Sequence, residues 1–534
     1  MKKLMILLMA ALPMLAMAQQ SLDVTVDSAG QLSTKIAEDQ RFKVADLKVS
    51  GQLNGADLKL LQQIVARTKT DSKNPGECLV NSIDMSGAII VESNIKGGLK
   101  TKADELPAAL FAGAKNLKRA VLPSGLKSTG REIFQNCEDL TDVVLPASLK
   151  ELGNEAFEGC KSLKVIELPI SLKEVPVQAF SGCKSLKAIN IPEDVKKIGG
   201  SAFKDCESLT SIVLPKSTDE IESAAFDGCS NLEAIEMASV QKIGANAFAG
   251  CKSLKSVNLE RISSLGMIAF TNCKSLETVN LEGSLADVNT GAFKGCSNLT
   301  SIKLPDGLRE ISSHAFEDCS QLTDITLPDG MTKIKDYAFQ KCTSLRSIVL
   351  PNSLKNLGDH AFEKCTSLES VTVGNLIDEI ETFAFHECTS LRSITLPNTV
   401  KRIGRNAFCD CTMLSEINWP AGLKTIEDAA FEKCQSLPSA NFSNGLKSIG
   451  GDAFKGCTQL TTVDLPVTLK EIGGSAFQEC PALRTVTVNS PAPPSITGDT
   501  FKKSNPVILI PKGSRPVYDA DKKWYKQKGV KENK

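Results

Sequence analysis

Apolar positions recur with a fixed period along most of this chain. One unit opens with Leu163-Lys-Val-Ile-Glu-Leu-Pro169 and closes with Ala179-Phe180-Ser-Gly-Cys183. Aligning the units gives the pattern L-x-x-I-x-L-P-x-x-L-k-x-I-G-x-x-A-F-x-x-C. The cysteine that ends each unit recurs every 23 residues, except for two steps of 22 between positions 229 and 273. These ladder cysteines are Cys137, Cys160, Cys183, Cys206, Cys229, Cys251, Cys273, Cys296, Cys319, Cys342, Cys365, Cys388, Cys411, Cys434, Cys457 and Cys480.

The pattern predicts the local structure of one unit. The alternation in L-x-x-I-x-L is typical of a half-buried strand, and the proline ends it because proline has no N–H for the ladder. L-k-x-I-G predicts a second short extended segment, with Gly153 or Gly358 permitting a tight corner. In A-F-x-x-C the apolar residues are three apart, so one helical turn points both inward. Since one unit cannot bury its own apolar face, we expect a stack of units with parallel strands on one face.

The repeat resembles the 23-residue class of bacterial leucine-rich repeats known as the BspA-like family. The resemblance covers about residues 105 to 490, roughly seventeen units of 22–23 residues, and rests on the A-F-x-x-C element and its spacing. It implies a right-handed leucine-rich repeat solenoid, β-rich with short helical turns, in a cell-surface or secreted bacterial protein. Several members of that family look like adhesins, and adhesion is expected here only through that resemblance.

The N-terminus has the pattern of an export signal. Lys2 and Lys3 precede an apolar stretch from Leu4 to Leu15, and Ala16-Met17-Ala18 is a small-residue cleavage box. The apolar stretch is shorter than the roughly 20 residues that span a bilayer. We therefore expect a signal peptide over residues 1–18 and an exported protein without a transmembrane segment. Its expected location is the medium, the cell surface or the periplasm of a Gram-negative bacterium.

The segments that flank the repeats are predicted to cap the array of residues 105–488, since a solenoid end exposes core and strand edges. Residues 19–104 form the expected N-terminal cap, with a helix over residues 56–66 that Asn54 or Asp57 could cap. Residues 489–534 form the expected C-terminal cap, with a last strand over residues 507–511 and a short helix over residues 518–528.

The balanced charge argues against binding to nucleic acid, and the lack of catalytic motifs argues against an enzyme. The chain has 62 basic and 62 acidic residues, so no basic excess favours binding to nucleic acid. No hydrolase, zinc-protease or nucleotide-binding motif occurs, so we expect neither an enzyme nor a cofactor. Of the three histidines, His314 and His360 share a register two units apart, about 10 Å from each other, and His386 lies in another, so no zinc site is expected.

The 18 cysteines do not suggest a disulfide framework. Equivalent side chains of stacked units run parallel about 4.8 Å apart, which does not suit a disulfide. A file of buried thiols that donate weak hydrogen bonds to carbonyls is the favoured interpretation. Cys78 and Cys409 lie off the ladder. The position of Cys409, two residues before Cys411, predicts that it lies on the outward side of its turn. There it is either the most reactive thiol or, as we favour, an inert surface residue.

Aromatic residues give no sign of a glycan-binding platform. Seventeen of the 21 phenylalanines occupy the inward A-F position, which leaves Phe42, Phe383, Phe442 and Phe501. Trp419 and Phe442 replace the third strand leucine and are expected to point inward as well. Packing thus accounts for almost every aromatic residue, and no stripe remains for stacking on a sugar.

The outward positions of the first strand form the candidate binding surface. They carry mostly small polar side chains, which suits a broad contact with an extracellular protein or peptide. The candidates for partner binding lie in the middle of the array, beside three units whose strand-ending proline is replaced by Ala238, Glu260 or Glu282: Asn258, Asn280, Lys303, Thr326 and Val349. The irregular sequence of those units indicates either a recognition site or neutral sequence drift. The leading hypothesis is an exported binding scaffold, and the alternative is a structural, envelope-organising solenoid with no specific ligand.

Overall fold

The computed structural model describes residues 20–66 and 79–533. The predicted signal peptide and Cys78 lie outside these residues. The chain divides into two compact units, one made of the residues up to Leu172 together with Gly182–Pro192, the other of Lys173–Ser181 and everything from Glu193 onward. Each is a solenoid of parallel strands, in agreement with the predicted leucine-rich repeat fold.

The first unit contains the expected N-terminal region and the first turns of the repeat. Helix α2 (Gly55–Val65) confirms the predicted helix. Both proposed residues cap its N-terminus: the Asn54 side chain accepts a hydrogen bond from Asp57 N, and the Asp57 carboxylate accepts one from Asn54 N. A six-stranded sheet pairs β2 with β1, β3 and β4, and continues through β6 to β8. The elements of the unit are β1 (Gln20–Val26), α1 (Leu32–Lys35), β2 (Val44–Leu53), α2, β3 (Ser82–Asp84), β4 (Ala88–Ile90), β5 (Glu105–Leu106), β6 (Arg119–Val121), β7 (Ser128–Thr129), β8 (Asp142–Val144), β9 (Val165–Glu167) and β11 (Ala188–Asn190).

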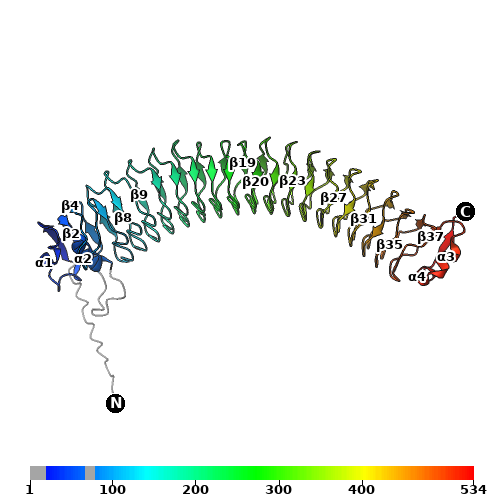
Figure 1. Cartoon of the computed structure of the whole chain (residues 1–534), viewed down its shortest axis with the longest axis horizontal. Helices are drawn as coiled ribbons and strands as arrows, with labels where there is room; N and C mark the ends of the chain where they lie inside the picture. The colour runs from blue at the N-terminus through cyan, green and yellow to red at the C-terminus, as the bar shows by residue number, and fades with distance from the viewer. Residues whose placement is uncertain (1–19, 67–78, 534) are drawn as a thin grey trace, which may run out of the picture. The chain divides into compact units, whose positions relative to one another are not determined.

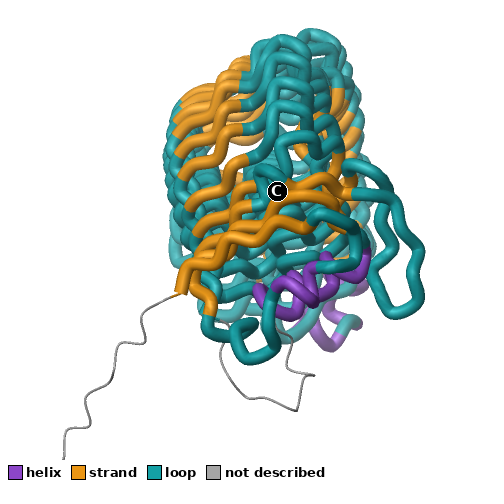
Figure 2. The backbone as a smooth tube through the Cα atoms, turned by 90° about the vertical axis from the view of Figure 1, so that its left-hand side faces the viewer, coloured by secondary structure: helices purple, strands orange, loops and turns teal. Residues whose placement is uncertain are grey.

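The second unit stacks its turns so that strands follow one another in two files, one from each extended segment of the repeat (Figure 1, green to orange; Figure 2, orange). The first segment gives the longer strands, of three or four residues except for the two-residue β30: β13 (Ser211–Val213), β15 (Ala234–Glu236), β17 (Ser256–Asn258), β19 (Thr278–Asn280), β21 (Ser301–Lys303), β24 (Ser347–Val349), β26 (Ser370–Thr372), β28 (Ser393–Thr395), β30 (Glu416–Ile417), β32 (Ser439–Asn441), β34 (Thr462–Leu465) and β36 (Thr485–Val488). The second segment gives two-residue strands: β10 (Glu174–Val175), β12 (Lys197–Ile198), β14 (Glu220–Ile221), β16 (Lys242–Ile243), β18 (Ser264–Leu265), β20 (Asp287–Val288), β22 (Glu310–Ile311), β23 (Lys333–Ile334), β25 (Asn356–Leu357), β27 (Glu379–Ile380), β29 (Arg402–Ile403), β31 (Thr425–Ile426), β33 (Ser448–Ile449) and β35 (Glu471–Ile472).

The A-F-x-x-C segment is a corner and not the predicted helical turn. Each corner has two residues in the left-handed region, one before the alanine and one before the cysteine, such as Ala429 (φ 54°) and Lys433 (φ 59°). Left-handed residues interrupt a right-handed helix, so only a tight turn remains, in which Cys434 N donates to Phe431 O at 3.1 Å. The phenylalanine and the cysteine still point inward, as expected, and both are fully buried.

The glycines of the second extended segment are required by close stacking. Neither Gly153 nor Gly358 has a positive φ, so the predicted need for conformational freedom is wrong. A Cβ atom at Gly153 would lie 2.1 Å from the carbonyl oxygen of Gly130, and one at Gly358 would lie 2.5 Å from the amide nitrogen of Asp336. Any side chain would therefore push successive turns apart.

Stacked apolar side chains fill the core of the second unit. The Phe248 and Phe270 rings lie 5.0 Å apart and 3° from parallel, and the same arrangement continues along the file of corner phenylalanines. Because each ring covers the face of the next, the file buries aromatic surface without a gap between turns. The core is thus one continuous layer that no single turn could form alone.

The end of the chain covers the last turns of the second unit. Strand β37 (Val507–Ile510) confirms the predicted last strand and pairs with β36, and β38 (Val530–Glu532) pairs with β37. The single helix predicted over residues 518–528 is wrong: Asp521 is extended and caps a second helix, giving α3 (Arg515–Ala520) and α4 (Lys522–Tyr525). Tyr518 and Trp524 are buried and donate to the carbonyl oxygens of Ser490 and Pro494, each at 2.7 Å.

No helix within residues 20–66 and 79–533 combines the length and the apolar character needed to cross a bilayer.

Candidate functional site

The strand face is defined here as the outward first and third residues of the longer strands from β13 to β28 in the second unit, together with the equivalent Asp324 and Thr326 of the turn between β21 and β24. The middle residue of such a strand points into the core, and its two neighbours point out: Val257 is buried, while Ser256 and Asn258 are exposed. Strands β13, β21, β24 and β26 repeat this pattern. Successive strands are parallel and in register where they pair, so equivalent side chains stand in rows. The face is therefore regular and consists mainly of small side chains.

The structure places four of the five candidate residues on the open surface. Asn258, Lys303, Thr326 and Val349 are exposed, and Asn280 is half-buried. Val349 is 63% exposed, which is high for an apolar side chain in the middle of an array.

The candidates do not share one continuous sheet. Asn258, Asn280 and Lys303 lie on the sheet β17–β19–β21, whereas Val349 lies on the sheet that begins with β24. Between the two sheets, the turn that carries Thr326 has no assigned longer strand and only one bridge, from Asp324 to Ser301. The surface therefore consists of two patches joined by a less regular turn.

The irregular units place carboxylates among the first three candidates. Asn280 Nδ2 donates to Glu260 Oε1 at 2.8 Å, and Glu260 N donates to Asn258 Oδ1 at 3.2 Å. Lys303 Nζ forms an ion pair with Glu282. Proline at position 260 would have no N–H to donate, so the substitution that makes the unit irregular also creates this polar network.

A file of stacked rings lies at the corners of four consecutive turns and was missed by the sequence analysis. His314, Tyr337, His360 and Phe383 occupy the left-handed position before the corner alanine, and their ring centroids are 4.8, 4.5 and 4.6 Å apart in that order. The sequence expectation considered phenylalanine and tryptophan only and did not include this mixed file of histidine, tyrosine and phenylalanine rings. Interplanar angles of 4–9° show that the rings cover each other's faces, so the file presents edges to solvent and no open platform for a sugar.

Two buried carboxylates lie beneath this file. Glu317 accepts from His314 Nδ1 at 2.6 Å and forms an ion pair with Lys294 Nζ at 2.8 Å. Glu363 accepts from His360 Nδ1 at 2.7 Å and from Gln340 at 2.6 Å. Burial by itself raises the pKa of each carboxyl, but these hydrogen bonds outweigh it and hold both pKa values below the ordinary range. Both groups therefore stay charged at neutral pH and bind neighbouring turns together.

The repeat region matches the family described as the BspA type leucine rich repeat region (6 copies), over residues 104–233, 223–343, 263–392 and 378–507. These matches extend over well more than half of the chain. The chain belongs to the BspA-type leucine-rich repeat family.

Two solved structures of leucine-rich repeat proteins are among those similar to this BspA-type chain. A leucine-rich repeat protein from Bacteroides ovatus is 28% identical, with a TM-score of 0.50, and the alignment covers 75% of this chain and 92% of that one. A leucine rich cell surface protein from Faecalibacterium prausnitzii is 23% identical over 70% of this chain and 88% of its own, with a TM-score of 0.28. No curated protein matches this BspA-type chain.

The placement of Cys409 in this BspA-type repeat differs from both sequence interpretations. Its side chain is buried, with the residue only 5% exposed, and Sγ donates to Asp410 Oδ2 at 3.3 Å. Burial and the negative charge of Asp410 raise the pKa of the thiol to about 12. Cys409 is therefore neither a surface substitution nor an activated thiol, since reactive cysteines have lowered pKa values and solvent access.

Proposed function

We propose that the chain is an exported scaffold, secreted or held at the bacterial surface, that binds an extracellular protein or peptide through the strand face. Adhesion is the role that fits such a scaffold best. Export is supported by the signal-peptide pattern of residues 1–18. The mode of binding is supported by the strand face itself.

The observation that carries this proposal is the combination of apolar and small polar side chains on a rigid surface. Val213 and Val349 are 58% and 63% exposed and stand among outward serine, threonine and asparagine side chains. In protein interfaces a few apolar anchors provide most of the affinity, and their surroundings mainly exclude water. Because the strands are fixed by the stack, binding costs little ordering of the backbone.

The polar network around Glu260 and Glu282 supports the same surface. Before any partner arrives, the Glu260 and Glu282 carboxylates hold Asn280 and Lys303, and the backbone N–H of Glu260 holds Asn258. Such ordered side chains act as a pre-arranged polar rim beside the apolar part of the face. We therefore place the contact across the turns that carry β13 to β26.

Site-specific photo-crosslinking tests the proposal. A photoreactive amino acid is introduced into the mature chain at Val349 on the strand face, or at the exposed Asn356 on β25 of the same turn. Each protein is then incubated with extracellular and cell-surface proteins of the habitat in which the bacterium grows. We expect a discrete adduct from position 349 that unlabelled protein competes away, that persists at raised salt, and that position 356 does not give.

Two outcomes would contradict the proposal. A competed adduct that forms from position 356 and not from position 349 would place the contact on the other file of strands. Crosslinking only between copies of this chain, with no second protein, would favour the structural solenoid without a specific ligand.

A further inference from the structure

The residue that follows each corner phenylalanine forms a file of its own along the second unit. In four consecutive turns this position carries Glu363, His386, Cys409 and Glu432, each 23 residues from the next. All three residue types, glutamate, histidine and cysteine, are metal ligands. In the sequence they are far apart and resemble no motif, but the 23-residue period brings them to one surface.

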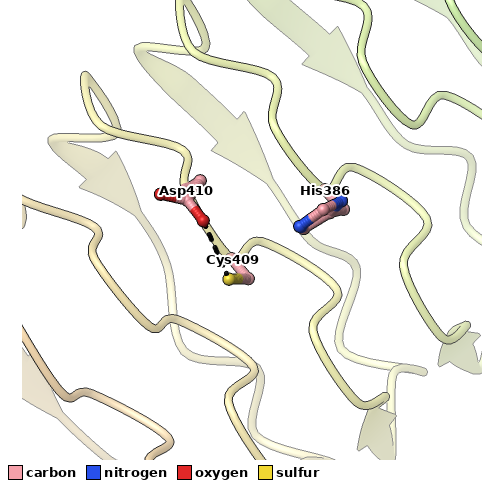
Figure 3. A group of neighbouring side chains, drawn as sticks. All are labelled: His386, Cys409 and Asp410. Atoms are coloured by element: carbon pink, nitrogen blue, oxygen red, sulfur yellow. Dashed lines mark hydrogen bonds between the residues drawn. The ribbon is translucent and has the colours of Figure 1, made fainter.

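The structure brings three ligand-type side chains together at this file. One ligand atom each of His386, Cys409 and Asp410 lies within 4.8 Å of the other two. Figure 3 shows His386 on one turn with a ring nitrogen directed toward Cys409 and Asp410 on the next turn. The expectation of no zinc site rested on the spacing of the three histidines from one another and did not consider Cys409 and Asp410 one turn after His386.

The imidazole of His386 lies among carboxylates as well as beside the thiol. Its buried Nδ1 makes no hydrogen bond and lies 3.5 and 3.6 Å from carboxylate oxygens of Glu363 and Glu387. The ring also makes an edge-to-face contact with Phe383, at a centroid distance of 5.1 Å. Nitrogen, oxygen and sulfur atoms that can bind a metal ion therefore gather around one imidazole.

We propose that His386, Cys409 and Asp410 form a zinc-binding site that ties two successive turns of the solenoid together. Sulfur, imidazole nitrogen and a carboxylate oxygen are a ligand set that zinc accepts in tetrahedral geometry. Zinc–ligand bonds of about 2.0–2.3 Å place such atoms about 3.4–3.6 Å apart, so small rotations of the side chains close the group around the ion. Water fills the fourth position, or the carboxylate of Glu363 or Glu432 does.

Zinc binding displaces one proton from the site. The Cys409 thiol exchanges its S–H bond for a sulfur–zinc bond, and the proton leaves to solvent. Before the metal binds, this proton lies in the hydrogen bond from Sγ to Asp410 Oδ2, at 3.3 Å. Asp410 then changes from the acceptor of the S–H bond to a ligand.

Zinc titration of the mature chain tests the site. Metal-free protein is titrated with zinc sulfate against a chromophoric chelator, and with cobalt chloride to follow the thiolate-to-cobalt absorption band. We expect one tight zinc ion per chain, a cobalt–thiolate band, and no competition from magnesium. C409S and H386Q should each weaken zinc binding by at least about 100-fold, since even the loss of a group that only orients a ligand costs 10–100-fold. D410N should weaken it as well.

H314Q is the matched control. His314 is a half-buried imidazole three turns earlier, bonded to Glu317 and outside the ligand group and its neighbours. H314Q should bind zinc as the parent protein does, and circular dichroism checks that every variant is folded. Zinc affinity that is unchanged in both C409S and H386Q, or equal affinity for zinc and magnesium, would overturn the proposal. So would a cobalt complex without the thiolate band.

Discussion

The thiol of Cys411 donates a hydrogen bond to the carbonyl oxygen of Phe385 in the preceding turn, at 3.1 Å. Every ladder cysteine makes the equivalent bond, 25 or 26 residues back along the chain. The expected file of thiols that bond to carbonyls is thus confirmed. Cysteine suits this position because it is small and apolar, yet its thiol donates a second hydrogen bond to a carbonyl oxygen that already accepts from a backbone N–H, as Phe385 O does from Cys388 N.

The first prediction concerns these thiols. Alkylation under denaturing, non-reducing conditions should modify at least sixteen of the eighteen cysteines, since all seventeen described cysteines are present as thiols. In the native protein alkylation should be slow even at pH 8, because burial raises the pKa of thiols such as Cys137 and Cys480 to about 12. Mass spectrometry counts the labels. If most cysteines resist labelling until a reductant is added, the file is bridged by disulfides instead.

The second prediction tests the left-handed corners. Gly456 (φ 75°) and Lys341 (φ 59°) occupy the same corner position in different turns. G456A should destabilise the protein by about 1–2 kcal/mol through backbone strain alone, because the nearest atom to the new Cβ is 3.4 Å away. K341G should stabilise it by about 0.5–1 kcal/mol, because the relief of backbone strain exceeds the additional conformational entropy that glycine loses on folding. Urea denaturation measures both. If this segment were a helical turn, G456A would stabilise the protein and K341G would destabilise it.

The third prediction concerns acid stability and Glu317. Its carboxyl is buried, which raises the pKa, but hydrogen bonds from Lys294 and His314 bring the pKa below the ordinary value. The stabilisation is therefore fully present above the unfolded pKa of about 4.3 and is lost as the pH falls through the lower folded value. At pH 7, E317Q should cost about 1.5–3 kcal/mol, the range for a hydrogen bond to a charged group.

Thermal melts from pH 7 to pH 3 check this. The difference in stability between the parent protein and E317Q should stay constant down to about pH 5 and shrink below that pH. The exposed-site variant E369Q should remain within about 0.5 kcal/mol of the parent throughout. A difference that grows as the pH falls would mean that the carboxyl is not held charged in the folded protein.

The periodic features of the fold were predictable from the sequence, because each position of the repeat has the same surroundings in every turn. The inward Phe408 and Cys411 follow directly from the A-F-x-x-C spacing, and so does the outward direction of Asn258 next to buried Val257. The nature of the corner was not predictable from apolar spacing. A helical turn and a left-handed corner both place residues three apart inward, and only the φ angles distinguish them.

The side-chain groupings were missed because they depend on neighbours one turn away. Cys409 was judged by its nearness to Cys411, whereas its surroundings are set by His386, 23 residues earlier. Likewise Tyr337 fills the gap between His314 and His360, which the sequence analysis placed in one register without noting what lies between them. Writing out each repeat position as a column would have revealed both files.

The account as a whole rests on the claim that the strand face is where a partner binds. Two triple variants of equal change in net charge isolate that face: K303A/T326E/V349E on the strand face, and S264E/K333A/N356E at exposed positions on the two-residue strands. The strand-face set keeps Asn258 and Asn280, whose bonds to Glu260 belong to the internal network. None of the six side chains is buried, so both variants should unfold at nearly the parent temperature.

The deciding measurement is the dissociation constant of each variant for the protein captured by crosslinking at Val349. The strand-face variant should bind at least about 100-fold more weakly than the parent, since loss of a few central anchors removes most of the binding free energy. The control variant should bind within about threefold of the parent, as expected for substitutions outside the contact. Weak binding by the control variant together with parent-like binding by the strand-face variant would contradict the account.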